Sequence, residues 1–393
     1  MSMNIRSLAK GLKYCGEATG KRQTYFVFES AAGFVVMSAS RTKRASGYFN
    51  LVSRDAVGQI RKRYAGKQDV TAKALATRSR GAGVRDALQA LNILEGMNVR
   101  YMRHNSAPYL HAVTESLKLA FADRNKYVAD PKFTPNIPML QMLSKEYATI
   151  RRALIDPDKA IAGEAPFGNP RQTATSSQPI AYANPQPGAD YTQVITGEEN
   201  GHTTYLAVVD KDRNMVSVTS SLLSLFGSGH VVKGAGFVLN NRMAYYGLDE
   251  DDINVLKPGK RVRQTINPAL ALKDGKPYMV FGTPGADTQP QAQLQFFLNV
   301  AEFGMNVQQA LEQDYVVSTS FKSSYYPHAA EGKLQIPSTV PKHVLDELAA
   351  MGHKLDLRNV RGVGSVKAII IHPRTGVLMG GVSPTRDSYV MAY

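Results

Sequence analysis

Cysteine and tryptophan are almost missing from this chain of 393 residues: Cys15 is the only cysteine, and there is no tryptophan. One thiol cannot form a disulfide within the chain, and it cannot build a zinc site from several thiolates. No apolar run reaches the roughly 18 residues that a membrane-spanning helix needs. Residues 1–22 also lack the apolar core of a signal peptide. The sequence therefore predicts a cytoplasmic protein without a membrane segment.

Several common catalytic motifs are absent as well. The chain has no HExxH zinc motif, no GxSxG nucleophile elbow, no Walker A phosphate loop and no GxGxxG dinucleotide loop. Its eight histidines are scattered without metal-ligand spacing, and most are expected at the surface or at helix ends. The sequence thus predicts no metal ion and no cofactor. Loops rich in glycine and hydroxyl side chains remain as candidate sites.

Positive charge is concentrated at the N-terminus. Residues 1–80 hold 16 of the 47 lysines and arginines but only 4 of the 32 acidic residues, so they carry +12 of the net +15. This asymmetry predicts a domain boundary near residue 80, with a small basic α+β unit before it. Its tyrosines and phenylalanines among cations could hold nucleic acid through phosphate contacts and stacking. The alternative is a solvated basic face, since no nucleic-acid-binding motif is present.

The pattern of apolar residues predicts an α+β fold with sheets packed against helices. The proline-dotted, polar residues 164–202 are typical of a loop or tether. Strands are expected at residues 24–30, 33–40, 203–210, 214–221, 236–241, 268–272, 277–282, 366–372 and 377–382. Helices are expected at residues 53–66, 86–96, 105–131, 290–304 and 338–352, with Asn105 or Ser106 as a cap of the third.

A pair of threonines begins the strand that follows the tether. One interpretation is an ordinary hairpin behind a long loop; the other is that the chain is cut between His202 and Thr203. The cut would free an α-amine with an unperturbed pKa of roughly 7.7–8, able to take the proton of the Thr203 hydroxyl. Backbone N–H groups at Gly285 and Ala286 could then stabilise an oxyanion. This arrangement indicates acyl transfer from an amide to water or to an amine.

The motifs from about Gly81 to Tyr393 resemble the γ-glutamyltranspeptidase family of N-terminal-nucleophile hydrolases. The matching segments are LQALNILEG, HNSAPYLHAVTESLKLAFADR, TTYLAVVDKDRN, FGSG, LNN, PGKR, GTPGAD and GGVSPTRDSYVMAY. The resemblance implies a four-layer αββα sandwich, with residues 81–202 as the large-subunit-like region and 203–393 as the small-subunit-like region. It also implies self-cleavage before Thr203 into two fragments that stay associated. It also implies that Thr203 is the nucleophile, that Ser221 hydrogen-bonds it, and that Gly285 and Ala286 form the oxyanion hole.

The substrate-binding positions depart from the family pattern. Tyr245 stands in place of the aspartate that holds the glutamyl amine, and Arg242 in place of a glutamine. Leu223 replaces an asparagine, Gln264 and Thr265 replace a pair of serines, and Tyr205 replaces a histidine. These changes resemble a branch of transpeptidase-like amidohydrolases and acylases. They imply a small anionic or uncharged amide as substrate, rather than glutathione.

The first 80 residues do not resemble the family. Relatives carry a longer segment there, which supplies core strands and an arginine for the substrate carboxylate. Both a complete and an incomplete sandwich therefore remain open for this chain. Three hypotheses remain open at this point: an active amidohydrolase, a catalytically inactive relative, and a protein that binds nucleic acid through residues 1–80.

Overall fold

The structure is a computed structural model. It describes residues 82–171, 203–359 and 364–392, together with the backbone of four strands nearer the N-terminus. These strands are β1 (Glu17–Thr19), β2 (Gln23–Ser30), β3 (Gly33–Ser40) and β4 (Tyr48–Val52). Within this described part, no helix is long and apolar enough to cross a membrane.

Two antiparallel sheets lie face to face. The larger has seven strands in the order β1-β2-β3-β7-β8-β12-β13, and the smaller has three in the order β4-β6-β5. Their remaining strands are β5 (Thr203–Val209), β6 (Met215–Ser221), β7 (Ala269–Lys273), β8 (Lys276–Gly282), β12 (Lys367–Ile371) and β13 (Leu378–Val382). The aromatic ring of Tyr205 on β5 packs so closely on Gly282 of β8 that a Cβ there would lie 2.2 Å from the ring. This contact fixes β5 over the end of β8.

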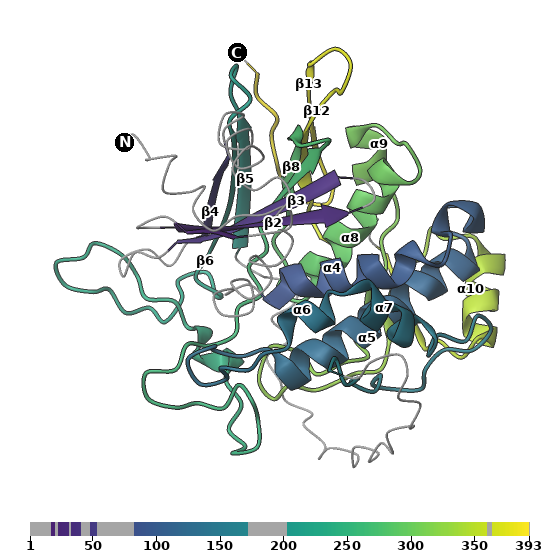
Figure 1. The fold of residues 1–393 in the computed structure, drawn as a ribbon, viewed down its shortest axis with the longest axis horizontal. Coiled ribbons are helices and arrows are strands. Elements are labelled where there is room, and N and C mark those ends of the chain that lie inside the picture. Colours follow the sequence, from purple (N-terminus) through teal and green to yellow (C-terminus); the bar gives the residue numbers. More distant parts are fainter. Residues whose placement is uncertain are drawn as a thin grey trace.

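Helices cover the other face of the seven-stranded sheet. Phe296 and Phe297 of α8 (Thr288–Ala301) pack on Phe281 of β8, with ring centroids 5.4 Å and 6.2 Å away. Behind α8 lie α4 (Ala82–Glu95) and α5 (Ala107–Tyr127), and Figure 1 shows the three gathered on one side of the strands. The order of layers is thus helices, seven-stranded sheet, three-stranded sheet.

The remaining elements extend the helical side. They are α6 (Met139–Met142), α7 (Lys145–Arg152), α9 (Val307–Leu311), α10 (Lys342–Ala350), the 3-10 helices η1 (Val99–Met102) and η3 (Arg242–Tyr245), and a small sheet of β9 (Val317–Ser318), β10 (Leu334–Pro337) and β11 (Leu355–Arg358). A second apolar core joins α5, α8 and α10 to the sheet of β9, β10 and β11. It surrounds the stacked rings of Phe121 and Phe321, whose centroids are 3.7 Å apart.

Local sequence signals located most helices correctly. The helix expected at 105–131 is α5, and Ser106 is its cap, because the Ser106 Oγ atom accepts a hydrogen bond from the Tyr109 N–H at 3.4 Å. The strand expected at 236–241 is wrong. Gly234 and Gly236 have φ angles of 77° and 69°, and this left-handed backbone breaks the extended conformation. Only one isolated bridge forms in that region.

The N-terminal strands belong to the two main sheets. β3 pairs with β7, and β4 pairs with β6, so the strands predicted at 24–30 and 33–40 extend the sheet that the C-terminal half builds. The domain division near residue 80 stays a prediction. The predicted helix 53–66 and most of the tether, residues 172–202, lie outside the described residues. Three layers of the expected four-layer sandwich are seen in the described part, and the second helical layer stays a prediction.

Candidate active site

Thr203 and Ser221 face each other across the hairpin β5–β6. They are register partners, and cross-strand partners point to the same face of a sheet. The Thr203 Oγ1 atom lies 2.9 Å from the Ser221 Oγ atom, which is hydrogen-bond distance. At the far end of the hairpin, the Asp210 carboxylate accepts the Asn214 N–H at 2.8 Å and stabilises the turn that sets this register. The predicted hydroxyl pair is therefore brought together, while His202 lies outside the described residues.

Ser221 receives two further donors. The Leu223 backbone N–H donates to the Ser221 Oγ atom at 3.1 Å, and the Arg242 Nη2 atom donates to it at 2.6 Å. Leu223 has a φ of 81°, a conformation that side-chain-bearing residues rarely adopt, and it turns the chain sharply after β6. Strain of this kind persists where the surrounding structure imposes it, often at functional sites.

Arg242 is the cation of this site. It is the first residue of η3, its side chain is only 4 % exposed, and its guanidinium carbon lies 5.3 Å from the centre of the Tyr245 ring. Its Nη1 atom is buried and makes no hydrogen bond within the described part of the chain. Among the described residues, no carboxylate lies within ion-pair distance of Arg242. Within the described residues, the positive charge of Arg242 next to the Ser221 hydroxyl is therefore not compensated by a carboxylate.

The turn at Gly285 and Ala286 offers free backbone donors. It connects β8 to α8, and its φ angles of 119° and 45° are both in the left-handed half of conformational space. The two carbonyl groups accept hydrogen bonds from the Thr288 and Gln289 N–H groups. Within the described residues, the N–H groups of Gly285 and Ala286 make no hydrogen bond. Unused N–H groups at a helix start are suited to hold a developing negative charge.

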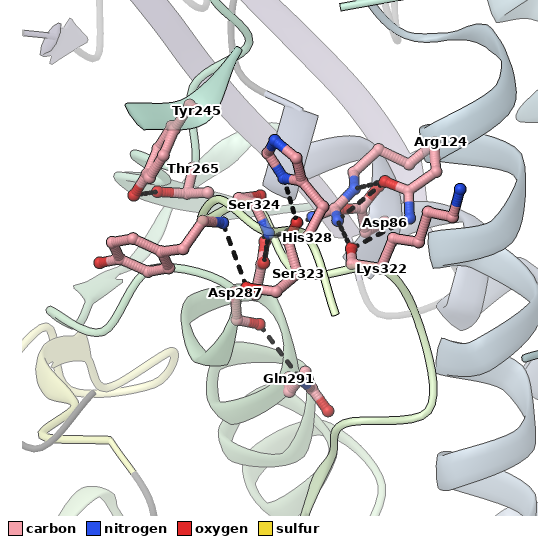
Figure 2. Close-up of polar contacts among 12 residues, drawn as sticks. Asp86, Arg124, Tyr245, Thr265, Asp287, Gln291, Lys322, Ser323, Ser324 and His328 are labelled. Carbon is pink, nitrogen blue, oxygen red and sulfur yellow. Dashed lines mark hydrogen bonds and ion pairs between the residues drawn. The ribbon is translucent and has the colours of Figure 1, made fainter. Parts of the chain in front are cut away.

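A buried ion pair anchors this turn (Figure 2). The Arg124 Nη1 atom of α5 donates to the Asp287 Oδ1 atom at 2.6 Å, and Ser324 donates to the same carboxylate through its N–H at 2.7 Å and its hydroxyl at 2.8 Å. Burial acts to raise the pKa of Asp287, but the Arg124 charge and the Ser324 hydrogen bonds outweigh it and hold that pKa below the usual value. Asp287 is therefore an ionised anchor for the start of α8.

Asp86 on α4 approaches the same guanidinium. Its Oδ2 atom is 3.5 Å from the Arg124 Nη1 atom, and both side chains are buried. Burial raises the pKa of Asp86 to about 7, against the opposing charge of Arg124, and Asp287 raises it further. Asp86 and Asp287 thus share one arginine with opposite pKa shifts. No sequence pattern indicated this cluster, although Arg124 and Asp287 lie in two of the segments that carried the family resemblance.

Of the remaining predicted pocket residues, Tyr245 and Thr265 are joined by a hydrogen bond, whereas the Gln264 side-chain oxygen has no partner among the described residues. The Tyr245 hydroxyl and the Thr265 Oγ1 atom are 3.2 Å apart, both side chains are buried, and the Tyr245 ring meets the Tyr325 ring edge-on at 5.0 Å. The Tyr245 ring packs on the Arg242 guanidinium, which in turn donates a hydrogen bond to Ser221. Gln264 is different, because its Oε1 atom is buried without a hydrogen-bond partner in the described part of the chain.

A second buried cluster lies away from this site, between α5 and the end of α10. The Oε and ring nitrogen atoms of His111, Glu115 and His353 lie within 4.8 Å of one another, a spacing that could hold a metal ion. However, the His111 ring bridges His353 and the Asp156 carbonyl, each at 2.8 Å, and Glu115 forms an ion pair with Lys118 at 2.9 Å. Protein partners therefore account for these groups as a structural network.

Comparisons with known proteins decide the family. The sequence model of the gamma-glutamyltranspeptidase family matches residues 64–393. The chain belongs to this family. The match begins before Gly81, so it includes part of the basic N-terminal stretch that residue motifs alone did not connect to the family.

Relatives of this family member are hydrolases and acylases. The glutathione hydrolase-like YwrD proenzyme of Bacillus subtilis is 31% identical over 76% of this chain and 50% of its own length. The acylase ACY 1 proenzyme of Pseudomonas sp. (strain SE83) is 31% identical over 77% of this chain and 47% of its own length. The crystal structure of cephalosporin acylase from Bacillus halodurans superposes with a TM-score of 0.63 at 32% identity, over 80% of this chain and 50% of that one. The chain thus spans about half the length of these relatives.

Proposed function

We propose that this chain is an amidohydrolase that cuts itself before Thr203 and then uses Thr203 to take an acyl group from a small amide. The observation that carries the proposal is the Thr203–Ser221 hydroxyl pair at the start of β5. Two further features support it: the unused N–H groups of Gly285 and Ala286, and the proenzyme names of relatives. The free α-amine of Thr203 would accept the hydroxyl proton, and the acyl-enzyme would be released to water or to an amine.

We also propose that the substrate lacks the α-ammonium group of glutathione. The Tyr245 hydroxyl is already paired with Thr265, and no described carboxylate forms an ion pair with Arg242. A buried guanidinium repels a substrate ammonium held near it and favours a neutral or anionic acyl group. The two fragments would remain together after the cut, because β5 and β6 contribute to the packed pair of sheets.

Self-cleavage is tested on a denaturing gel and by mass spectrometry. A cut before Thr203 divides the 42.9 kDa chain into fragments of about 22 and about 21 kDa. Thr203→Ala removes the nucleophile and should stay whole. A wild-type chain that stays intact after long incubation contradicts the proposal and favours a catalytically inactive relative.

The substrate class is tested with three anilides that differ by one group at a time. Glutaryl anilide is γ-glutamyl anilide without the ammonium group, and butyryl anilide lacks the terminal carboxylate as well. We expect the glutaryl or butyryl compound to be hydrolysed faster than the γ-glutamyl compound. Efficient turnover of γ-glutamyl anilide, with little of the other two, contradicts the expected substrate class while leaving the nucleophile assignment standing.

A further inference from the structure

The Ser221 hydroxyl has more donors around it than it can accept. The Arg242 Nη2–H group, the Leu223 N–H group and the Thr203 hydroxyl all lie between 2.6 Å and 3.1 Å from its oxygen. A hydroxyl oxygen has two lone pairs and one proton of its own. Guanidinium and amide N–H groups can only donate, so these two occupy both lone pairs. The hydrogen bond between Ser221 and Thr203 must therefore use the proton of Ser221.

We propose that Arg242 is a positioning residue that fixes the direction of this hydrogen bond: Arg242 donates to Ser221, and Ser221 donates to Thr203. Taken alone, the positions of the two hydroxyl oxygens, 2.9 Å apart, favour Thr203 as the donor to Ser221. A hydroxyl proton can rotate, however, so other donors around Ser221 can reverse this direction. The additional donors at Ser221 remove that freedom. This inference rests on the proposed function of Thr203 as the nucleophile.

The surroundings of Arg242 hold its guanidinium on Ser221. The Arg242 backbone N–H donates to the Asn240 Oδ1 atom at 3.0 Å, which fixes the start of η3. The Tyr245 ring lies 5.3 Å from the guanidinium carbon and covers it. Since no described carboxylate pairs with it, its charge acts on the Ser221 hydroxyl that it contacts and, through that hydroxyl, on Thr203.

The direction of the hydrogen bond decides where the Thr203 proton goes. Ser221 cannot accept it, because both lone pairs of its oxygen are engaged. After the cut, the Thr203 α-amine takes this proton while the Thr203 oxygen bonds the acyl carbon. The resulting ammonium then returns the proton to the leaving nitrogen as the C–N bond breaks. Ser221, polarised by Arg242, donates to the Thr203 oxygen and offsets the negative charge that develops there before the acyl bond forms.

Two substitutions separate charge from packing. Arg242→Met keeps much of the side-chain volume but removes donors and charge, and Arg242→Lys restores a cation that can donate. Met243→Ala is the matched control, because Met243 is the next residue of η3 and is 67 % exposed. For each purified variant, the rate of self-cleavage and the pH profile of kcat/KM are measured on an amide that the wild type hydrolyses, with thermal melts to check folding.

We expect Arg242→Met to lower both rates by about 10²-fold, as loss of a donor at a developing negative charge does. It should also move the acidic limb of the pH profile to higher pH, because removing a nearby cation raises the pKa of the Thr203 α-amine. Arg242→Lys should restore most of the lost rates and most of the wild-type position of the acidic limb, and Met243→Ala should match the wild type in both. If Arg242→Met does not fold, Arg242→Gln keeps a donor without the charge and should show the same shift of the limb.

A folded Arg242→Met protein with an unchanged acidic limb overturns the inference, even if its rate is lower. Failure of the proposed function gives a different result, because the wild type itself then neither cleaves its own chain nor hydrolyses any of the amides. In that case a double-mutant cycle of Arg242→Met and Ser221→Ala on thermal stability tests the Arg242–Ser221 contact on which the inference depends. Coupled effects support this contact, and additive effects overturn the inference.

Discussion

Asp287, whose side chain is 13 % exposed, and the buried Arg124 form an ion pair of 2.6 Å although 163 positions separate them in the chain. The pair ties α5 to the first residue before α8, next to the turn of Gly285 and Ala286, whose N–H groups make no hydrogen bond with any described residue. Ser324 adds two hydrogen bonds to the same carboxylate. The geometry of the proposed oxyanion hole therefore depends on a contact between distant parts of the chain.

Removing this anchor should cost both stability and activity. Asp287→Ala leaves the buried Arg124 charge with Asp86, at 3.5 Å, as its nearest described carboxyl group, and we expect the free energy of unfolding to fall by roughly 3–5 kcal/mol. The matched control is Asp346→Ala, which breaks the exposed Lys342–Asp346 pair and should cost less than about 1 kcal/mol. Urea denaturation of the three proteins measures the difference. Equal losses in the two variants would show that Asp287 is not an anchor.

The raised pKa of Asp86 should appear in the pH dependence of stability. The unfolded carboxyl ionises near 3.8, whereas burial keeps the folded one protonated up to about pH 7. The unfolded state binds fewer protons in this window, so folding is progressively disfavoured as pH rises from about 4 to about 7. Because asparagine does not ionise, the free energy of unfolding of Asp86→Asn should rise relative to that of the wild type across this range, by at most about 4 kcal/mol. Denaturation at pH 5 and pH 8 measures it, and parallel pH curves for the two proteins contradict the shift.

The lowered pKa of His353 has the opposite consequence. Burial, followed by the neighbouring His111 and Lys118, lowers this pKa to about 3. An unfolded histidine binds a proton below about pH 6.5, so the stability from the neutral buried ring is lost as pH falls from there toward 3. His353→Gln should flatten this acid slope, whereas His343→Gln, an exposed residue on α10, should keep it. Thermal melts from pH 7 to pH 4 compare them, and equal slopes in both variants speak against the assignment.

The parts of the site that were predictable from sequence are those that depend on neighbours along the chain. The hairpin of residues 203–221 followed from its two strand patterns and short polar turn, and the contact of Thr203 with Ser221 followed from the family resemblance. The cap of α5 at Ser106 is equally local. Asp86 and Arg124 gave no such signal, because their meeting with Asp287 depends on how three helices pack.

The position of Arg242 shows a second limit of sequence reasoning. The resemblance placed a cation near the nucleophile, but it could not show that the side chain is 4 % exposed and donates to Ser221. That outcome depends on η3 folding back toward β6, after a glycine-containing loop whose apolar residues 237–239 wrongly indicated a strand. A short apolar run alone does not distinguish a strand from a loop that exposes its apolar side chains.

The packing of Tyr205 on Gly282 gives a test of how the two sheets position Thr203. A Cβ at Gly282 would lie 2.2 Å from the Tyr205 ring, and the Tyr205 hydroxyl is fixed by Ser217 at 2.7 Å, so the ring has little room to move. Gly282→Ala should therefore push β5 away from β8, lower the free energy of unfolding by about 1–3 kcal/mol and slow self-cleavage. In a Tyr205→Ala background the same substitution should cost much less, because the clash is gone. Equal costs in both backgrounds, measured by denaturation, would mean that this contact does not set the distance between the strands that carry Thr203 and the oxyanion turn.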